Sequence, residues 1–294
     1  MRWFSTRVIT GIFEAIVRVD RAGPGAYRAG SVYTGPNAVD ILLREQSESG
    51  VLTLVLHRPE RKNAIDVALA DELTRALEHA EESSSVRVVV LTGNGDAFCS
   101  GGDLVGEGDE RHALATMRRM SRPAVALHRL SKPTVARVNG LASGAGWSLA
   151  LGCDLVVASE QARFCQIFVR RALSPDLGSS WLLPRLVGLH RAKELALLGR
   201  WLPAAEAHAL GLVNRVVPAE ELDAAVADYA EALAAGPPVT LALTKRMLAE
   251  AGLREFEAAI EAECNAQCVN LATQDTREAF RAFFEKREPR FEGR

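Results

Sequence analysis

Two glycine-rich segments are the part of this sequence best suited to chemistry. One covers residues 97–103 and reads AFCSGGD, and the other covers residues 139–146 and reads NGLASGAG. Each follows an apolar run typical of a β-strand, and the second leads directly into a predicted helix. Glycine lets a ligand approach the backbone closely, and amides at the start of a helix have no partner within the helix. We therefore interpret both segments as candidate binding loops.

Two such loops side by side could direct two backbone N–H groups at one oxygen atom. That geometry stabilises an enolate or another oxyanion. The alternative, from spacing alone, is a pair of tight strand-to-helix turns that bind nothing. Neither loop has the spacing of a dinucleotide-binding fingerprint, a phosphate-binding P-loop or a nucleophile elbow.

The surrounding pattern alternates strands with helices, which predicts an α/β fold with a helical C-terminal region. Strands are expected at residues 51–56, 86–91, 134–138, 155–158 and 213–217. Helices are expected at residues 66–82 with Asp66 as the N-cap, at 110–130 with a division at Pro123, at 146–151, at 203–210, and over most of 220–294. We expect three regions: an N-terminal extension over 1–38, a core over 39–235 and a helical region over 236–294.

Composition limits the classes of partner and compartment. The 294 residues are 48% hydrophobic and 24% charged with a formal net charge of −2, so we expect a globular protein with no basic field for nucleic acid. The apolar stretch at 8–19 is too short and too charged to span a membrane, and we interpret the extension as a leader or an upstream start. The five cysteines show no metal or disulfide pattern, which favours a reducing compartment, the cytoplasm. Cys264 and Cys268, four residues apart on a predicted helix, are expected to be buried.

An ordered set of short motifs along the chain indicates a resemblance to a known family. The pieces, in chain order, are residues 57–59 (HRP) with 62–64 (KNA), 97–104, 132–140, 144–146, 153–154 (CD), Phe164, 174–176 (SPD) and 209–213. With this order and spacing the chain resembles the crotonase superfamily, the enoyl-CoA hydratase/isomerase family, over about residues 39–294. Each piece alone is a weak signal, whereas the ordered set is highly specific.

The resemblance implies a spiral of ββα units and a homotrimer or dimer of trimers, in which the C-terminal helices cover a neighbour's active site. Apolar residues that suit such an interface are Leu241, Met247, Phe256, Ile260, Phe280 and Phe284, and the alternative is packing within the chain. The resemblance also implies an oxyanion hole formed by the backbone N–H groups of Gly102 and Ala145. Alanine is acceptable at the second position if its φ is not positive. No metal or resident cofactor is implied, because CoA arrives as part of an acyl-CoA thioester.

The same resemblance implies a set of substrate contacts. The CoA nucleotide is expected near the first loop and near Arg58 and Lys62, for which the alternative is solvated surface charge. The expected substrate-binding residues are Arg58, Lys62, Ala64, Ser100, Gly101, Asp103, Leu104, Leu141, Gly146, Ser148, Phe168 and Pro175.

The acid–base residues decide the reaction. Hydratases of the family use two glutamates, whose positions are occupied here by Ser148 and Phe168. A single carboxylate, Asp176, matches the position of the working acid in isomerase-type relatives. It is followed by residues 181–185 (WLLPR), as in the branch that contains ring-opening phenylacetyl-CoA enzymes. The alternative for Asp176 is an N-cap of the helix that follows.

The leading interpretation is therefore an enoyl-CoA isomerase that moves a C=C bond from the 3,4 to the 2,3 position through Asp176. A second is a hydratase or hydrolase in which Asp176 activates water. A third is a dehalogenase-type enzyme with Asp176 as the nucleophile. A binding or scaffold paralogue without catalysis also stays open, although two retained glycine loops and one acid favour chemistry.

Overall fold

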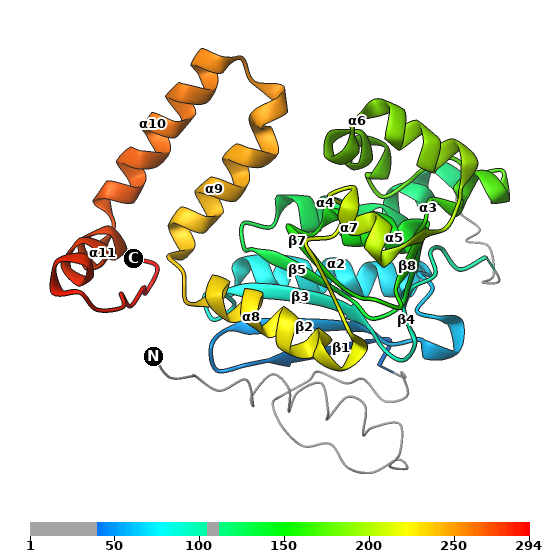
Figure 1. Ribbon diagram of the computed structural model, residues 1–294, viewed down its shortest axis with the longest axis horizontal. Coiled ribbons are helices and arrows are strands. Elements are labelled where there is room, and N and C mark those ends of the chain that lie inside the picture. The colour runs from blue at the N-terminus through cyan, green and yellow to red at the C-terminus, as the bar shows by residue number, and fades with distance from the viewer. Residues whose placement is uncertain (1–39, 105–111) are drawn as a thin grey trace, which may run out of the picture.

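Two β-sheets form the centre of the molecule. The computed structural model describes residues 40–104 and 112–294, so the predicted N-terminal extension lies outside the described residues. The six-stranded sheet has the order β1-β2-β3-β5-β7-β10 and is parallel except for β1 (Figure 1). Its strands are β1 Leu42–Gln46, β2 Val51–Leu56, β3 Val88–Gly93, β5 Thr134–Val138, β7 Leu155–Ser159 and β10 Arg215–Val217.

A smaller sheet lies beside the first and contains part of each glycine-rich segment. Its order is β4-β6-β8-β9, with only β9 antiparallel to its neighbour. Its strands are β4 Ala97–Cys99, β6 Leu141–Ser143, β8 Arg163–Cys165 and β9 Leu202–Pro203.

The chain visits the two sheets in a regular sequence. Each of β3, β5 and β7 adds to the large sheet, the next strand adds to the small sheet, and one or more helices follow. This repeat confirms the predicted spiral of ββα units. The helices are α2 Val67–Glu82, α3 Ala113–Met120, α4 Arg122–Arg129, α5 Ala145–Gly152, α6 Ser179–Leu198, α7 Ala204–Ala209, α8 Leu222–Ala234, α9 Pro238–Glu250, α10 Phe256–Ala272 and α11 Gln274–Glu285.

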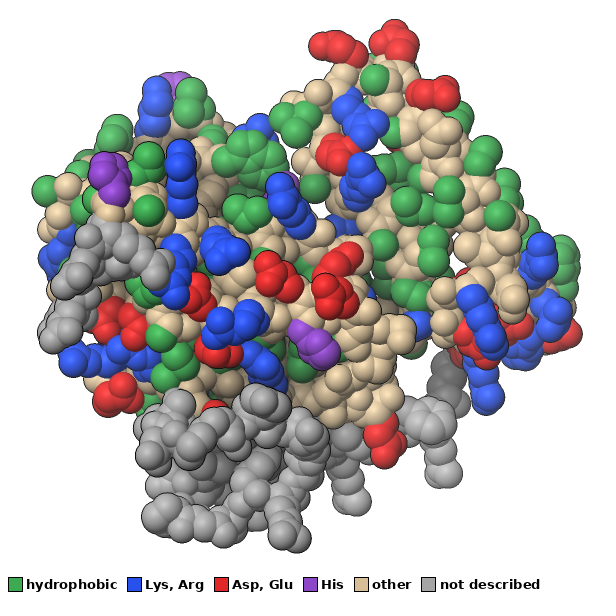
Figure 2. Space-filling model, turned by 180° about the vertical axis from the view of Figure 1, so that it is seen from behind, with side chains coloured by type: hydrophobic (Ala, Val, Ile, Leu, Met, Phe, Trp, Pro, Cys, Tyr) green, Lys and Arg blue, Asp and Glu red, His purple; other side chains and the backbone are tan. Residues whose placement is uncertain are grey.

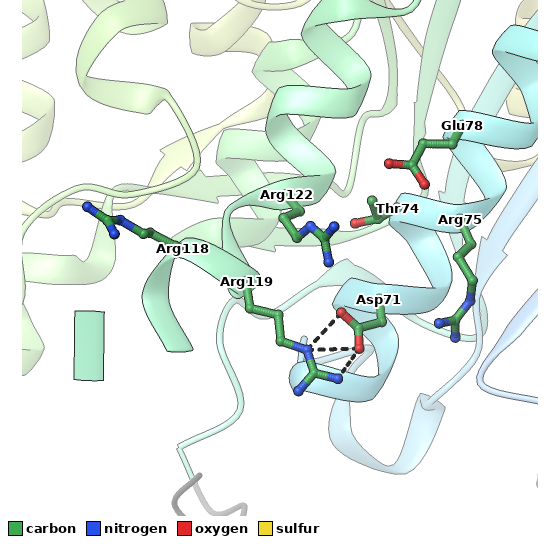
Figure 3. Close-up of a pocket in the computed structure, with 7 residues that line it drawn as sticks. All are labelled: Asp71, Thr74, Arg75, Glu78, Arg118, Arg119 and Arg122. Carbon is green, nitrogen blue, oxygen red and sulfur yellow. Dashed lines mark hydrogen bonds and ion pairs between the residues drawn. The ribbon is translucent and has the colours of Figure 1, made fainter. Parts of the chain in front are cut away.

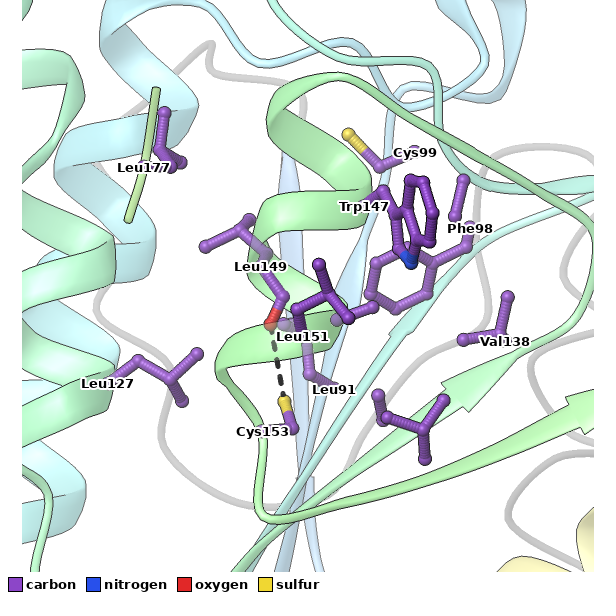
Figure 4. Packing of buried hydrophobic residues seen from close by; sticks show 14 of the residues in the cluster. Leu91, Phe98, Cys99, Leu127, Val138, Trp147, Leu149, Leu151, Cys153 and Leu177 are labelled. Atoms are coloured by element: carbon purple, nitrogen blue, oxygen red, sulfur yellow. Dashed lines mark hydrogen bonds between the residues drawn. The ribbon is translucent and has the colours of Figure 1, made fainter. Parts of the chain in front are cut away.

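The large sheet is buried on both faces because its side chains alternate between two cores. Val88 and Val90 of β3 face α8, whereas Val89 and Leu91 face the core that contains α2 and the small sheet. In that core Trp147 of α5 packs on Phe98 and Phe164 (Figure 4). The base of α5 is thereby held rigidly against the strand that carries the first glycine loop.

The C-terminal helices α9–α11 extend away from the α/β body (Figure 1). Their base is fixed by Lys245, whose Nζ lies 2.8 Å from a carboxylate oxygen of Asp154. Apolar side chains follow the outer parts of these helices (Figure 2), including exposed Phe256, Ile260, Phe280 and Phe284. Packing within the chain therefore does not account for these four residues. Leu241 and Met247 of α9 are half-buried.

The prediction that Cys264 and Cys268 are buried is wrong. Both are exposed. The reason is that α10 packs mainly against α9 and α11, which leaves most of its surface in solvent. Within the two described ranges, no helix combines the length and the apolar character that a membrane span requires.

Candidate active site

The first glycine loop begins where β4 ends. Gly101 has φ +110°, a conformation that side-chain-bearing residues rarely adopt. Its neighbour Gly102 pairs with Ile65 as in a parallel sheet: Ile65 N–H donates to Gly101 O, and Asp103 N–H donates to Ile65 O, both at 2.8 Å. Because backbone polar groups alternate in direction along an extended chain, the N–H of Gly102 points away from Ile65.

The second glycine loop ends at the start of α5. Gly144 is the N-cap, with φ +51°, and Ala145 is the first helical residue. The N–H of Ser148 donates to Gly144 O at 3.0 Å, so the N–H of Ala145 lies ahead of the first helical hydrogen bond. Ala145 is not among the residues with positive φ, which satisfies the condition under which alanine is acceptable here.

The two loops are in direct contact. The hydroxyl of Ser143 donates to Ser100 O at 2.7 Å. A methyl group placed on Gly101 would lie 3.0 Å from Ser143 O and only 3.6 Å from the amide nitrogen of Ala145. The structure therefore brings together the two segments that the sequence singled out, and only glycine leaves the space between them open.

Close packing on β4 fixes the position of α5. A methyl group on Gly146 would lie 2.3 Å from Cys99 O and 2.7 Å from Cys99 Sγ, distances that no real Cβ shows. Gly146 was expected to contact the substrate, but its evident constraint is this approach of helix to strand. Without it the amide of Ala145 would move away from the first loop.

We expect Gly146→Ala to lower the free energy of unfolding by at least about 2 kcal/mol, because it overpacks the core against a backbone carbonyl. Gly252→Ala is the matched control, since a methyl group there meets nothing within 4 Å. Urea unfolding of both variants measures the difference. Equal midpoints would show that β4 and α5 can separate without cost.

Asp176 precedes α6 and does not cap it. Gly178 is the N-cap and no side chain caps the helix; Ser179 N–H instead donates to the backbone carbonyl of Asp176 at 3.1 Å. The alternative of a helix cap is therefore wrong. Asp176 Oδ1 is buried and has no hydrogen-bond partner among the described residues. A buried carboxylate oxygen without a partner is costly for folding, which is typical of a functional group.

The surroundings of Asp176 change its acidity. Burial raises the pKa of Asp176 from 3.8 to about 6. Burial also raises the pKa of the Cys99 thiol to about 12, and the negative charge of Asp176 adds to that rise. Cys99 Sγ in turn accepts a hydrogen bond from Gly101 N–H at 3.4 Å. The field of Asp176 thus reaches the strand end from which the first glycine loop starts.

An apolar wall closes the other side of the second loop. Phe168 lies in the 3₁₀ helix Ile167–Arg171 and is buried, and two of its ring carbons are 3.7 Å from where a methyl group on Gly144 would lie. The hydroxyl of Ser148, which is also buried, donates to Gly144 O at 3.1 Å. At the two positions where hydratases carry glutamates, this chain therefore has an aromatic ring and a hydroxyl group. The hydroxyl of Ser148 already donates its proton to the backbone at the start of α5.

The two basic candidates differ in their surroundings. Arg58 is largely enclosed: its guanidinium lies 2.8 Å from Asp103 and 3.2 Å from Asp66, and donates to Ala64 O. It holds the first glycine loop to the start of α2. Lys62 is more than half exposed, with Nζ 3.6 Å from Asp96. Contact with CoA stays a prediction for both, and Lys62 has the more accessible charge.

The remaining predicted contacts lie around the same loops. Ala64 is buried, Leu141 begins β6 opposite Ala97, and Pro175 directly precedes Asp176. Leu104 is exposed at the last described position before residues 105–111, which lie outside the described part of the chain.

One positioning residue was not singled out from the sequence. Asn63 is fully buried with φ +56°, and its side-chain amide donates to Asn94 O and Ala97 O at 2.9 and 2.8 Å. Its Oδ1 accepts from Arg58 N–H at 3.0 Å. This amide joins three segments beneath the first loop. An asparagine beside a tight turn is the only signal that the sequence offers, because asparagine tolerates positive φ.

The structure is an α/β fold that sets two glycine loops in contact, near the half-buried carboxyl of Asp176. Residues 46–294 match the family model described as enoyl-CoA hydratase/isomerase. The chain belongs to this family.

Relatives in the family carry different activities. The chain is 38% identical over 253 residues to the 1,2-epoxyphenylacetyl-CoA isomerase of Escherichia coli K12, covering 84% of this chain and 97% of the relative. It is 36% identical to the 2,3-dehydroadipyl-CoA hydratase of the same organism, covering 83% and 96%. A crystal structure of enoyl-CoA hydratase from Bacillus anthracis superposes with a TM-score of 0.84 at 32% identity, covering 87% of this chain and all of that one. These similarities confirm the crotonase fold and leave isomerase and hydratase unresolved.

Proposed function

We propose that this protein is an enoyl-CoA isomerase that converts 3-enoyl-CoA thioesters into 2-enoyl-CoA thioesters. The observation that carries the proposal is the half-buried Asp176 carboxyl, whose buried Oδ1 has no hydrogen-bond partner among the described residues and whose pKa is raised to about 6. A carboxyl with that pKa can take a weakly acidic proton and return it at neutral pH.

The reaction needs one carboxylate used twice. Asp176 removes a proton from C2, and the electron pair moves into the thioester carbonyl to form a dienolate. The N–H groups of Gly102 and Ala145 donate to the resulting oxyanion. The protonated Asp176 then delivers the same proton to C4, and the double bond settles between C2 and C3. Atoms and charge balance without a metal or redox cofactor, and CoA takes part only as the thioester.

Hydration is the weaker candidate. Addition of water needs one group to activate the water and a second to protonate the α-carbon. Phe168 and Ser148 cannot supply either group, and the apolar ring of Phe168 favours exclusion of water. The hydrolase alternative needs Asp176 to activate water, which the apolar ring of Phe168 disfavours. The dehalogenase alternative needs Asp176 to attack an aryl carbon, and the aromatic ring at Phe168 is the residue of the site that is compatible with it.

We also propose that the protein forms a homotrimer or a dimer of trimers through the C-terminal helices. The exposed phenylalanines at 256, 280 and 284 support it, because side chains of that size are rarely left in water in such numbers.

Incubation of the enzyme with a 3-enoyl-CoA and, separately, with a 2-enoyl-CoA tests the proposed reaction, with products separated by chromatography and mass. We expect the 3-enoyl substrate to convert without a change in mass. Gain of one water by the 2-enoyl substrate, with no turnover of the 3-enoyl substrate, would contradict the proposal and support a hydratase. Tight thioester binding without turnover of either would support the scaffold alternative.

A further inference from the structure

A second site of distinct character lies between α2, α3 and α4 (Figure 3). It is a hollow of about 630 Å³, and none of its lining residues belongs to either glycine loop. Its lining includes four arginines and two carboxylates: Arg75, Arg118, Arg119, Arg122, Asp71 and Glu78. Because the whole chain has a formal net charge of −2, this excess of positive charge is a local feature.

Two of these arginines are neutralised by neighbours. Arg119 of α3 donates to both carboxylate oxygens of Asp71 on α2, with Nε at 2.9 and 3.0 Å. This pair holds α3 against α2 and lowers the pKa of Asp71, to which the charges of Arg75 and Arg122 also contribute. Arg75 pairs with Glu72 on its own helix.

The other two arginines have no ion pair within residues 40–104 and 112–294. Arg122 points into the hollow between Thr74 and Arg119, whereas Arg118 lies at its rim (Figure 3). Glu78 supplies one opposing charge on the far side of Thr74. Asp71 offsets part of the positive charge of Arg119 and Arg122, and the guanidinium of Arg122, which makes no ion pair in the described part of the chain, is the group best placed to receive a further anion.

The hollow continues into a more apolar one along α2 and α4. The neighbouring space of about 380 Å³ shares Thr74, Glu78 and Arg122 with the first. Its further lining is apolar at Leu77, Val125, Ala126 and Leu130 and charged at Glu81 and Arg129. Val125 is almost half exposed there. The two spaces together can hold a charged group and an organic group attached to it.

We propose that this groove binds a phosphate ester or anhydride, with Arg122 as the central ligand and Arg118 at the entrance. The planar fork of a guanidinium matches two phosphate oxygens, which a single ammonium does not. The site is separate from the proposed thioester site, and the proposal does not depend on which reaction the enzyme catalyses.

Isothermal titration of the full chain with sodium pyrophosphate at fixed ionic strength tests the proposal. We expect Arg122→Gln to weaken binding at least 10-fold and Glu78→Gln to strengthen it several-fold, since the two changes remove opposite charges from one hollow. Arg277→Gln, an exposed change of the same kind on α11, is the control and should bind like wild type. Without anion, Arg122→Gln should melt no lower than wild type, because it loses no ion pair.

Adenosine diphosphate as a second probe separates the two sources of phosphate. Tighter binding than pyrophosphate, reduced by Val125→Asp, would identify an ester whose organic part occupies the apolar space. Equal affinities would identify the inorganic anion. Equal binding by Arg122→Gln and Arg277→Gln, or no binding of either probe at millimolar concentration, would overturn the proposal.

Discussion

Asp176→Asn is expected to slow isomerisation of a 3-enoyl-CoA severely, lowering kcat by about 10³-fold. Asparagine keeps the size of the side chain but cannot accept the proton from C2 or hold it until it is returned to C4. Thioester binding should persist, because the loops around Gly102 and Ala145 are untouched. Steady-state kinetics together with a direct binding measurement separate the two effects. Asp228→Asn, which removes an exposed carboxylate on α8, is the matched control.

The pH profile gives a second readout of the same carboxyl. The reaction needs Asp176 ionised, and its pKa is raised to about 6, so kcat/KM in the wild type should fall about tenfold per pH unit below pH 6. The residual activity of Asp176→Asn should not show this dependence. A wild-type profile with a midpoint near pH 4 would show that burial does not control this group.

The substitution Asp176→Asn should raise the free energy of unfolding although it lowers the activity. Because the folded-state pKa of Asp176 lies above its unfolded value of 3.8, the ionised carboxyl destabilises the fold, fully above pH 6 and not at all well below pH 4. At pH 8 the free energy of unfolding of Asp176→Asn should therefore exceed that of wild type by up to about 3 kcal/mol, and its unfolding temperature should be higher. Near pH 3 this gain should disappear. A variant that is less stable at pH 8 would mean that Asp176 is a structural group.

Long elements with a clear period were predictable from the sequence. The Asp66 N-cap of α2 and the bounds of β2 and β5 agree with the structure, and Asp66 accepts from Leu69 N–H at 2.8 Å as a capping side chain does. In these elements the local preference and the burial pattern point the same way. Pro123 also divides the helical stretch as expected, since α4 begins at Arg122.

The short strands of the small sheet were not predictable. Strands β4, β6 and β8 have three residues each, too few to show alternation, and two of them lie inside the glycine-rich segments. Strand β1 was missed because it is an edge strand with an outward polar face that resembles a loop. These omissions matter for function, because β4 and β6 are the strands that set the two loops side by side.

The residues of the candidate site were predictable from the sequence, whereas their burial, ion pairs and pKa values were not. The loops and Asp176 follow from motifs, whereas the pairing of Arg58 with Asp103 joins residues 45 positions apart. Nothing local in the sequence indicates that this guanidinium is enclosed. The raised pKa of Asp176 likewise depends on segments that fold around it. Tertiary contacts, and not residue type, turn these groups from surface charges into positioning and catalytic candidates.

Ala145→Pro is expected to remove one donor of the oxyanion hole and leave the fold in place. Proline has no N–H, and Ala145 is the first residue of α5, the helical position at which proline is best tolerated. The preceding residue, Gly144, has ψ −126°, which avoids the clash with the proline ring that a helical residue would meet. Loss of one such donor typically lowers kcat by about 10²–10³-fold.

The matched variant is Ala145→Gly, which keeps the N–H and removes only the methyl group. We expect it to retain most of the wild-type activity, so that the ratio between the proline and glycine variants measures the hydrogen bond alone. The loss should lie in kcat more than in KM, because negative charge develops on the thioester oxygen only as the proton leaves C2. Far-ultraviolet circular dichroism checks that α5 persists. Equal activity of the two variants would mean that the thioester oxygen lies elsewhere, and that the second glycine loop is a tight turn whose role ends with the packing of α5 on β4.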